Sequence, residues 1–179
     1  IRDRVLIVPG ARYLSGGGAV ATATGMDAVF WNPAGLSMGE SSVDVIFSNR
    51  QYIADIQNSF FGIATGLGDY KLGVSVRTFT VGDIDETTTA NPNGTGRYFK
   101  VKDFAFRLVY AKRLTDRLLV GFSLKYIFEV IDNTYMSGLA MDIGSNFNTG
   151  IYGFVLGMSV NSFGPDVQFH GEGLEKTVD

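Results

Sequence analysis

The sequence predicts an all-β protein whose antiparallel strands form part of a transmembrane β-barrel. Three observations predict this class. Apolar and polar residues alternate with a period of two along several segments, these segments are long, and their polar faces carry small residues with few charges. Such alternation gives a strand two chemically different faces. A tilted strand needs about 9–11 residues to cross a bilayer, and these segments supply them.

The composition of the 179-residue chain favours sheets over helices. It holds 23 Gly, 14 Phe and 8 Tyr, and only 18% of its residues are charged. Aromatic side chains suit the pleated surface of a sheet, whereas Gly weakens a helix interior by roughly 1 kcal/mol relative to Ala. The net charge of −3 gives no basic surface for nucleic acid, and the absence of Cys excludes disulfides and thiolate chemistry.

Residues 1–42 differ from the rest and are predicted to form a plug segment without strands. Residues 16–23 are small and show no alternation, residues 26–31 predict a short helical turn, and residues 32–36 predict a turn. A segment with so few bulky side chains cannot form its own core. We therefore expect it to pack inside or beneath a larger unit.

Residues 43–179 are predicted to form about seven strands of a partial barrel. The clearest covers residues 118–131, where large apolar side chains alternate with Gly121, Ser123, Lys125 and Glu129. The same pattern predicts strands at residues 72–77, 104–111, 135–147 and 152–161, and less regular strands at residues 43–50 and 58–66.

The connections predict two unlike ends of the sheet. Tight turns are expected at residues 67–69, 114–117 and 148–150, and they all fall at one end. Longer connections are expected at the other end, across residues 81–102, from residue 164 onward, and more briefly near residues 52 and 132. Membrane barrels show this asymmetry of short turns and long loops.

A soluble fold is the alternative for the same alternation. A β-sandwich or a lipid-binding barrel would turn the apolar faces inward. Its outer face would then carry Gly, Ala and Ser in place of the many Lys and Glu residues of a soluble surface. The membrane interpretation is therefore favoured.

Five charged residues fall on the predicted lumen face. A turn near residues 115–116 would place Arg107 opposite Lys125, so the two cations would need acidic partners, for which Glu129 and Asp142 are the candidates. A structural network that braces the barrel is favoured, and a polar constriction or a site for a ligand headgroup remains open. The five residues are Arg77, Arg107, Lys125, Glu129 and Asp142.

No pattern predicts catalysis, a metal site or a cofactor. His170 is the only His, and the Gly-x-Ser-x-Gly motif of a catalytic serine is absent. Asp83, Asp85 and Glu86 lack the spacing of a calcium-binding loop. We expect a protein that is not an enzyme.

Several short motifs occur in order along nearly the whole chain. They are Gly10-Ala11-Arg12 before the glycine-rich run, Phe30-Trp31-Asn32-Pro33-Ala34-Gly35-Leu36, and residues 82–87, 110–116, 124–127 and 164–166. Taken together, they resemble the PorV/PorQ family of bacterial outer-membrane proteins and, more distantly, the FadL family of transporters for hydrophobic compounds.

The resemblance implies a FadL-like barrel of about fourteen strands, with residues 1–42 as a hatch that plugs its lumen and the rest of the chain as its N-terminal half. It also implies the bacterial outer membrane, with lipid as a partner. Two transport roles are then open: an accessory of type IX protein secretion that holds exported cargo, or a passage for hydrophobic small molecules. The candidates for a ligand route along the hatch are Phe30, Trp31, Asn32, Pro33, Ala34 and Leu36, and those for cargo contact in a loop are Ile84 and Tyr98.

Two further functions stay open. Apolar strand faces and unpaired strand edges could assemble copies of the chain into a structural envelope or surface protein, which would make it a homo-oligomer. A soluble lipid-binding β-barrel is the other.

Overall fold

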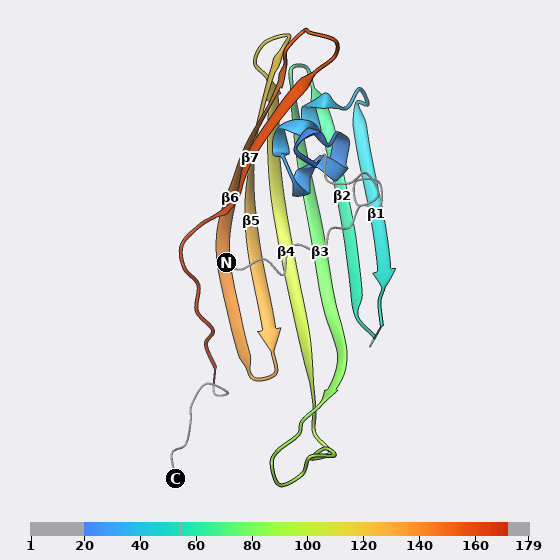
Figure 1. Ribbon diagram of the computed structural model, residues 1–179, viewed down its shortest axis with the longest axis vertical. Coiled ribbons are helices and arrows are strands. Elements are labelled where there is room, and N and C mark those ends of the chain that lie inside the picture. The colour runs from blue at the N-terminus through green and yellow to red at the C-terminus, as the bar shows by residue number, and fades with distance from the viewer. Residues whose placement is uncertain (1–19, 54, 172–179) are drawn as a thin grey trace.

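The computed structural model describes residues 20–53 and 55–171, which form mainly one antiparallel sheet (Figure 1). Neighbouring strands in the sequence are neighbours in the sheet, from β1 to β7. The prediction of an all-β chain with about seven strands is confirmed. The strands are β1 (Val43–Gln51), β2 (Gln57–Leu67), β3 (Tyr70–Asp85), β4 (Tyr98–Arg113), β5 (Leu118–Ile131), β6 (Thr134–Asn148) and β7 (Val155–Phe163).

The sheet is open, because β1 and β7 lie at its two edges and do not pair with each other. Four of its strands are 14 to 16 residues long. Such strands exceed the usual five or six residues of globular sheets. The Gly10-Ala11-Arg12 motif and the glycines at 16–18 lie outside the described residues.

Burial alternates along the strands and separates two faces. One face carries large apolar side chains that remain exposed, such as Phe47, Leu139 and Met158, which are 72%, 51% and 71% exposed. The opposite face is buried and carries Gly, Ala, Ser and charged residues. The predicted period of two is therefore present, with the large apolar side chains turned away from the buried side.

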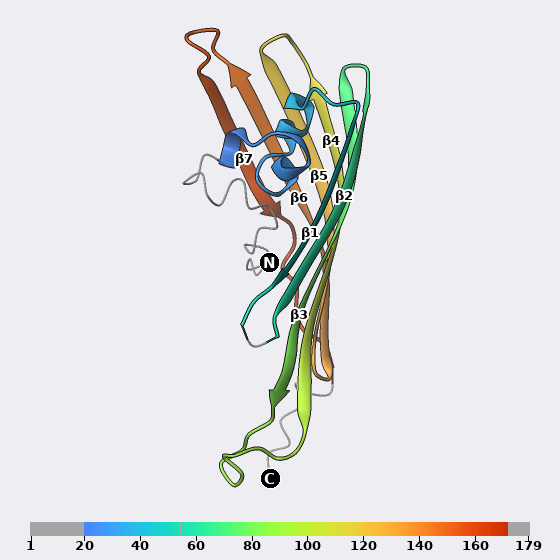
Figure 2. The ribbon, with the colours of Figure 1, turned by 90° about the vertical axis from the view of Figure 1, so that its right-hand side faces the viewer.

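Three short 3-10 helices cover part of the buried face, and the sheet curves around them (Figure 2). They are η2 (Val20–Thr22), η3 (Gly25–Phe30) and η4 (Pro33–Met38). The Asn32 side chain caps η4 by accepting a hydrogen bond from the Ala34 N–H at 3.0 Å. A small apolar core joins η3 and η4 to β2 and β4 through Met26, Val29, Leu36, Phe60, Ala64, Val109 and Ala111.

The connections correct two sequence-based expectations about the loops. The predicted connection across residues 81–102 is shorter, because β3 continues to Asp85 past an irregularity between Val81 and Ile84. Ile84 and Tyr98 therefore belong to strands β3 and β4, and the prediction that they are loop residues is wrong.

The two ends of the sheet differ less than the sequence predicts. The expected tight turn at residues 148–150 is a six-residue connection, 149–154, whereas β5 and β6 are joined by residues 132–133 alone. No helix within the described ranges has the length and hydropathy needed to cross a membrane.

Candidate functional site

The five charged residues predicted for the lumen face all lie buried on the inner face of the sheet. None is more than 8% exposed, and Asp142 is 1% exposed. Arg107 pairs with Lys125 across β4 and β5, so the predicted register is confirmed. Two cations side by side in a buried place need a counter-charge.

Asp142 on β6 supplies that counter-charge. Its Oδ1 lies 2.6 Å from Lys125 Nζ, and its Oδ2 lies 3.8 Å from Arg107 Nη2. The Ser123 hydroxyl donates a further hydrogen bond to Oδ2 at 2.6 Å. A carboxylate with this many donors is well compensated for the loss of water.

A distortion at the β6–β7 pairing completes the surroundings of Asp142. The register shifts between Met141 and Ile143, and Ser162 on β7 has a left-handed backbone with φ of 59°. Its N–H donates to Asp142 Oδ1 at 2.7 Å, and its hydroxyl accepts from Lys125 Nζ at 2.9 Å. Bulges re-aim side chains in this way. We name the set Arg107, Ser123, Lys125, Asp142 and Ser162 the Asp142 network.

Arg107 joins the Asp142 network to the N-terminal segment. Its guanidinium donates a hydrogen bond to the Val29 carbonyl and lies 5.0 Å from the centre of the Phe30 ring. Phe30 in turn packs edge-on against Phe60 of β2, with 4.4 Å between the ring centres. The buried arginine therefore ties η3 to the sheet by charge, hydrogen bonding and aromatic contact.

Arg77 lines the same small cavity as Arg107 and Lys125, and Glu129 lies further along β5. Arg77 Nε donates to Asn58 Oδ1 at 3.1 Å, and the negative charge of Asp103 attracts its guanidinium. Glu129 stands opposite Asp103 in the β4–β5 register. Asp103 is not among the residues predicted for the site, although it follows the same alternation as Arg107, and the alternation places Ser123 on this face without predicting its contact with Asp142.

Asn32 holds the N-terminal segment against β6. Its amide donates to the Ala21 carbonyl at 2.7 Å and to the Ser145 carbonyl of β6 at 3.0 Å. The approach depends on the absence of side chains at Gly121 and Gly144: a Cβ at Gly121 would lie 2.7 Å from the Ala34 Cα, and one at Gly144 would lie 2.8 Å from the Asn32 Cγ.

The other residues of the predicted ligand route are packed closely. Pro33, Ala34 and Leu36 are fully buried, and the Trp31 carbonyl accepts a hydrogen bond from the Asn161 amide at 2.9 Å. The cavity beside Phe30, Phe60 and Arg107 measures about 20 Å³. A cavity needs roughly 10–15 Å³ to hold one water, so this one has room for about a single water and for no larger molecule. A ligand could pass here only if the segment moved.

No group of His, Cys, Asp and Glu that could hold a metal ion occurs within residues 20–53 and 55–171. Comparison of the chain with family models, with curated proteins and with solved structures finds no match in any of the three. A function must therefore be argued from the residues and their geometry.

Proposed function

We propose that this chain forms part of a β-barrel of the bacterial outer membrane, in which the 20–42 segment belongs to a hatch that fills the lumen. The proposal follows the resemblance to the PorV/PorQ and FadL families and places the protein in transport. The observation that carries it is the division of the sheet into an exposed apolar face and a buried polar face.

The exposed face suits lipid better than water. Exposed large apolar side chains recur on all seven strands, whereas soluble monomers rarely expose a contiguous apolar patch above a few hundred Å². A lipid-facing band of this kind is typical of transmembrane barrels. The buried charges support the same orientation, because Asp142, Lys125 and Arg107 on the opposite face would meet the lumen and the hatch.

The hatch assignment rests on how the 20–42 segment is held. Arg107 and Asn32 bind it to β4 and β6, and its apolar residues pack on β2 and β4. A barrel continued beyond β1 and β7 would surround the segment. The full barrel of about fourteen strands remains part of the proposal.

Two transport roles are compatible with such a barrel, and variants separate them. For passage of hydrophobic small molecules, polar substitutions at Phe30 and Leu36 should reduce ligand uptake and leave cargo retention unchanged. For type IX secretion, substitution of Tyr98, which is 59% exposed at the start of β4, should release cargo without changing uptake. No effect in either assay would refute both roles.

The barrel itself is tested on the native, intact protein. Envelope fractionation with detergent extraction should yield an outer-membrane species whose electrophoretic mobility changes on heating and whose mass is about twice that of this 19.4 kDa chain. A species that stays dispersed and monomeric without detergent would refute the membrane assignment and favour a soluble lipid-binding barrel.

Self-assembly is a second candidate because β1 and β7 leave two unpaired edges within the described sheet. Unpaired edges can template pairing with another chain. A detergent-free species of this chain's own length that sediments as large assemblies would favour a structural envelope protein over transport.

A further inference from the structure

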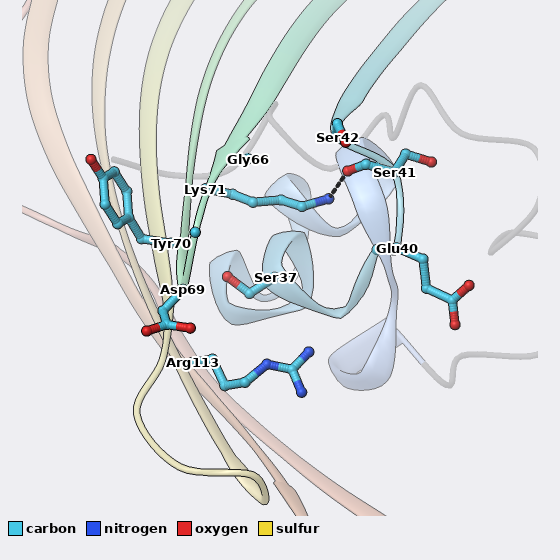
Figure 3. A pocket seen from close by; sticks show the side chains of 11 residues that line it. Ser37, Glu40, Ser41, Ser42, Gly66, Asp69, Tyr70, Lys71 and Arg113 are labelled. Carbon is cyan, nitrogen blue, oxygen red and sulfur yellow. Dashed lines mark hydrogen bonds between the residues drawn. The ribbon is translucent and has the colours of Figure 1, made fainter.

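A second polar cavity lies at the end of the sheet that carries the β2–β3 and β4–β5 turns, away from the Asp142 network (Figure 3). It measures about 240 Å³, well above the ~30 Å³ that a single water takes up in the liquid. Its walls come from the end of η4, the residues before β1, and the facing ends of β3 and β4. Hydroxyl groups and charged side chains dominate its lining, which is Ser37, Gly39, Glu40, Ser41, Ser42, Gly66, Gly68, Asp69, Tyr70, Lys71 and Arg113.

Lys71 is a fixed cation in this cavity. Its ammonium donates to Asp44 Oδ2 at 2.9 Å and to the Ser41 carbonyl at 2.8 Å, and the residue is 8% exposed. An ammonium has three N–H donors, so one donor remains after these two hydrogen bonds. The ion pair with Asp44 holds Lys71 in place and leaves it able to bind an acceptor.

Arg113, an exposed residue whose N–H donors are open to water, supplies a second cation. It lies at the end of β4, and its backbone N–H donates to the Asp69 carbonyl at 2.9 Å. Its guanidinium makes no hydrogen bond or ion pair with any residue that the structure describes. A guanidinium presents a planar set of five N–H donors, which suits the oxygens of phosphate or carboxylate.

Ser37 is the third donor. It is 7% exposed, and its hydroxyl oxygen has no hydrogen-bond partner in the described part of the chain. Figure 3 shows Ser37 between Lys71 and Arg113, with its hydroxyl oxygen turned away from the two cationic groups and the Glu40 carboxylate directed away from both. A buried hydroxyl without a partner costs about 1–3 kcal/mol, a cost that a bound acceptor would remove after rotation about the Ser37 side-chain bond.

We propose that this cavity binds a phosphate group between Lys71, Arg113 and Ser37. The group could belong to free phosphate or to the headgroup of an anionic phospholipid, since the two share the oxygens that these donors recognise. Asp69 and Glu40 also line the cavity, and Asp44 pairs with Lys71, so carboxylates outnumber the two cations and oppose the binding of an anion. We therefore expect weak binding that depends on the N–H and O–H donors of Lys71, Arg113 and Ser37. The proposal does not depend on the transport role.

The test compares two arginine variants of the full-length protein. Arg113→Gln removes the unused cation, and Arg117→Gln is the matched control, because Arg117 is an exposed arginine beyond the same turn that does not line this cavity. Titration calorimetry with inorganic phosphate measures one source. Binding to vesicles of phosphatidylcholine with and without phosphatidylglycerol measures the other.

We expect Arg113→Gln to weaken binding about tenfold or more, which corresponds to the loss of one charge-assisted hydrogen bond. Arg117→Gln should leave binding unchanged. Binding of inorganic phosphate would identify the free ion, and a response to phosphatidylglycerol alone would identify the headgroup. Absence of binding to both probes, or equal binding by the Arg113→Gln and Arg117→Gln variants, would overturn the proposal.

Discussion

Replacing Gly121 by Ala should detach the N-terminal segment from the sheet. The new Cβ would lie 2.7 Å from the Ala34 Cα and would overlap the Ala34 nitrogen and the Pro33 carbonyl carbon, all of them backbone atoms. Ordinary contact begins at 3.4 Å, and the Ala34 nitrogen and Pro33 carbonyl carbon would lie closer than the Ala34 Cα, so η4 must retreat by more than about 0.7 Å. A retreat of that size along the Asn32–Ser145 direction would lengthen their 3.0 Å hydrogen bond to about 3.7 Å, which is beyond hydrogen-bonding range.

The cost can be worked from these contacts. Overpacking of a close contact costs about 1–3 kcal/mol, and leaving the Asn32 amide or the Ser145 carbonyl buried without a partner adds about 1–3 kcal/mol. Undocking of the segment avoids both costs while the strand pairing of β1 to β7 stays intact. We therefore expect a variant with a folded sheet and a displaced segment.

Trp31 reports this displacement, because it is the only Trp of the sequence and lies next to Asn32. Acrylamide should quench its fluorescence more strongly in Gly121→Ala, and proteases should cleave within residues 20–42. The matched control is Gly66→Ala on β2, where the nearest atom to a new Cβ lies at an ordinary 3.6 Å. Quenching and cleavage that are the same in both variants and in the wild type would refute the reasoning.

Three further predictions concern the two faces and one loop. Leu124 lies on the exposed face of β5, and Leu124→Arg should lower the free energy of unfolding in bilayers by about 2–4 kcal/mol if that face meets lipid. A denaturant titration measures this change, and a change within about 0.5 kcal/mol would contradict the lipid-facing orientation. Asp142→Asn should lower the free energy of unfolding by about 3–5 kcal/mol, because it leaves buried cations without a counter-charge. Adding Lys125→Met to this variant should restore part of the lost stability. Losses that simply add in the same denaturant titration would contradict the pairing. Arg97→Gln should expose residues 86–97 to proteolysis, because Arg97 binds Asp132 at 2.6 Å. Its hydrogen bond to Asp132 raises the pKa of Arg97, so it stays protonated and the wild-type loop should remain equally protected at neutral and mildly alkaline pH.

The parts of the fold that depend on alternation could be predicted from the sequence. A two-residue period on either side of the turn at residues 114–117 fixes the β4–β5 register, which is why the pairing of Arg107 with Lys125 is correct. The same period misleads at residues 152–154, where Tyr152 and Phe154 continue the apolar pattern. Positive φ angles at Gly150, Tyr152 and Gly153 instead make that segment a loop.

The surroundings of Asp142 could be predicted only in part. Lys125 and Asp142 share a face by simple counting, but Ser162 reaches them through a change of register that no local pattern marks. The hydrogen bond from Arg107 ends on the backbone carbonyl of Val29, an acceptor that every residue possesses. Such contacts depend on tertiary packing and leave no trace in residue type.

The hydrogen bond between Asn32 and Ser145 also bears on the order in which the chain assembles. Every strand pairs with its neighbour in the sequence, so the hairpins can form one after another. Asn32, by contrast, is separated from its acceptor on β6 by 113 residues. The 20–42 segment precedes all seven described strands in the sequence, yet its hydrogen bond to Ser145 cannot form until the sheet has grown as far as β6.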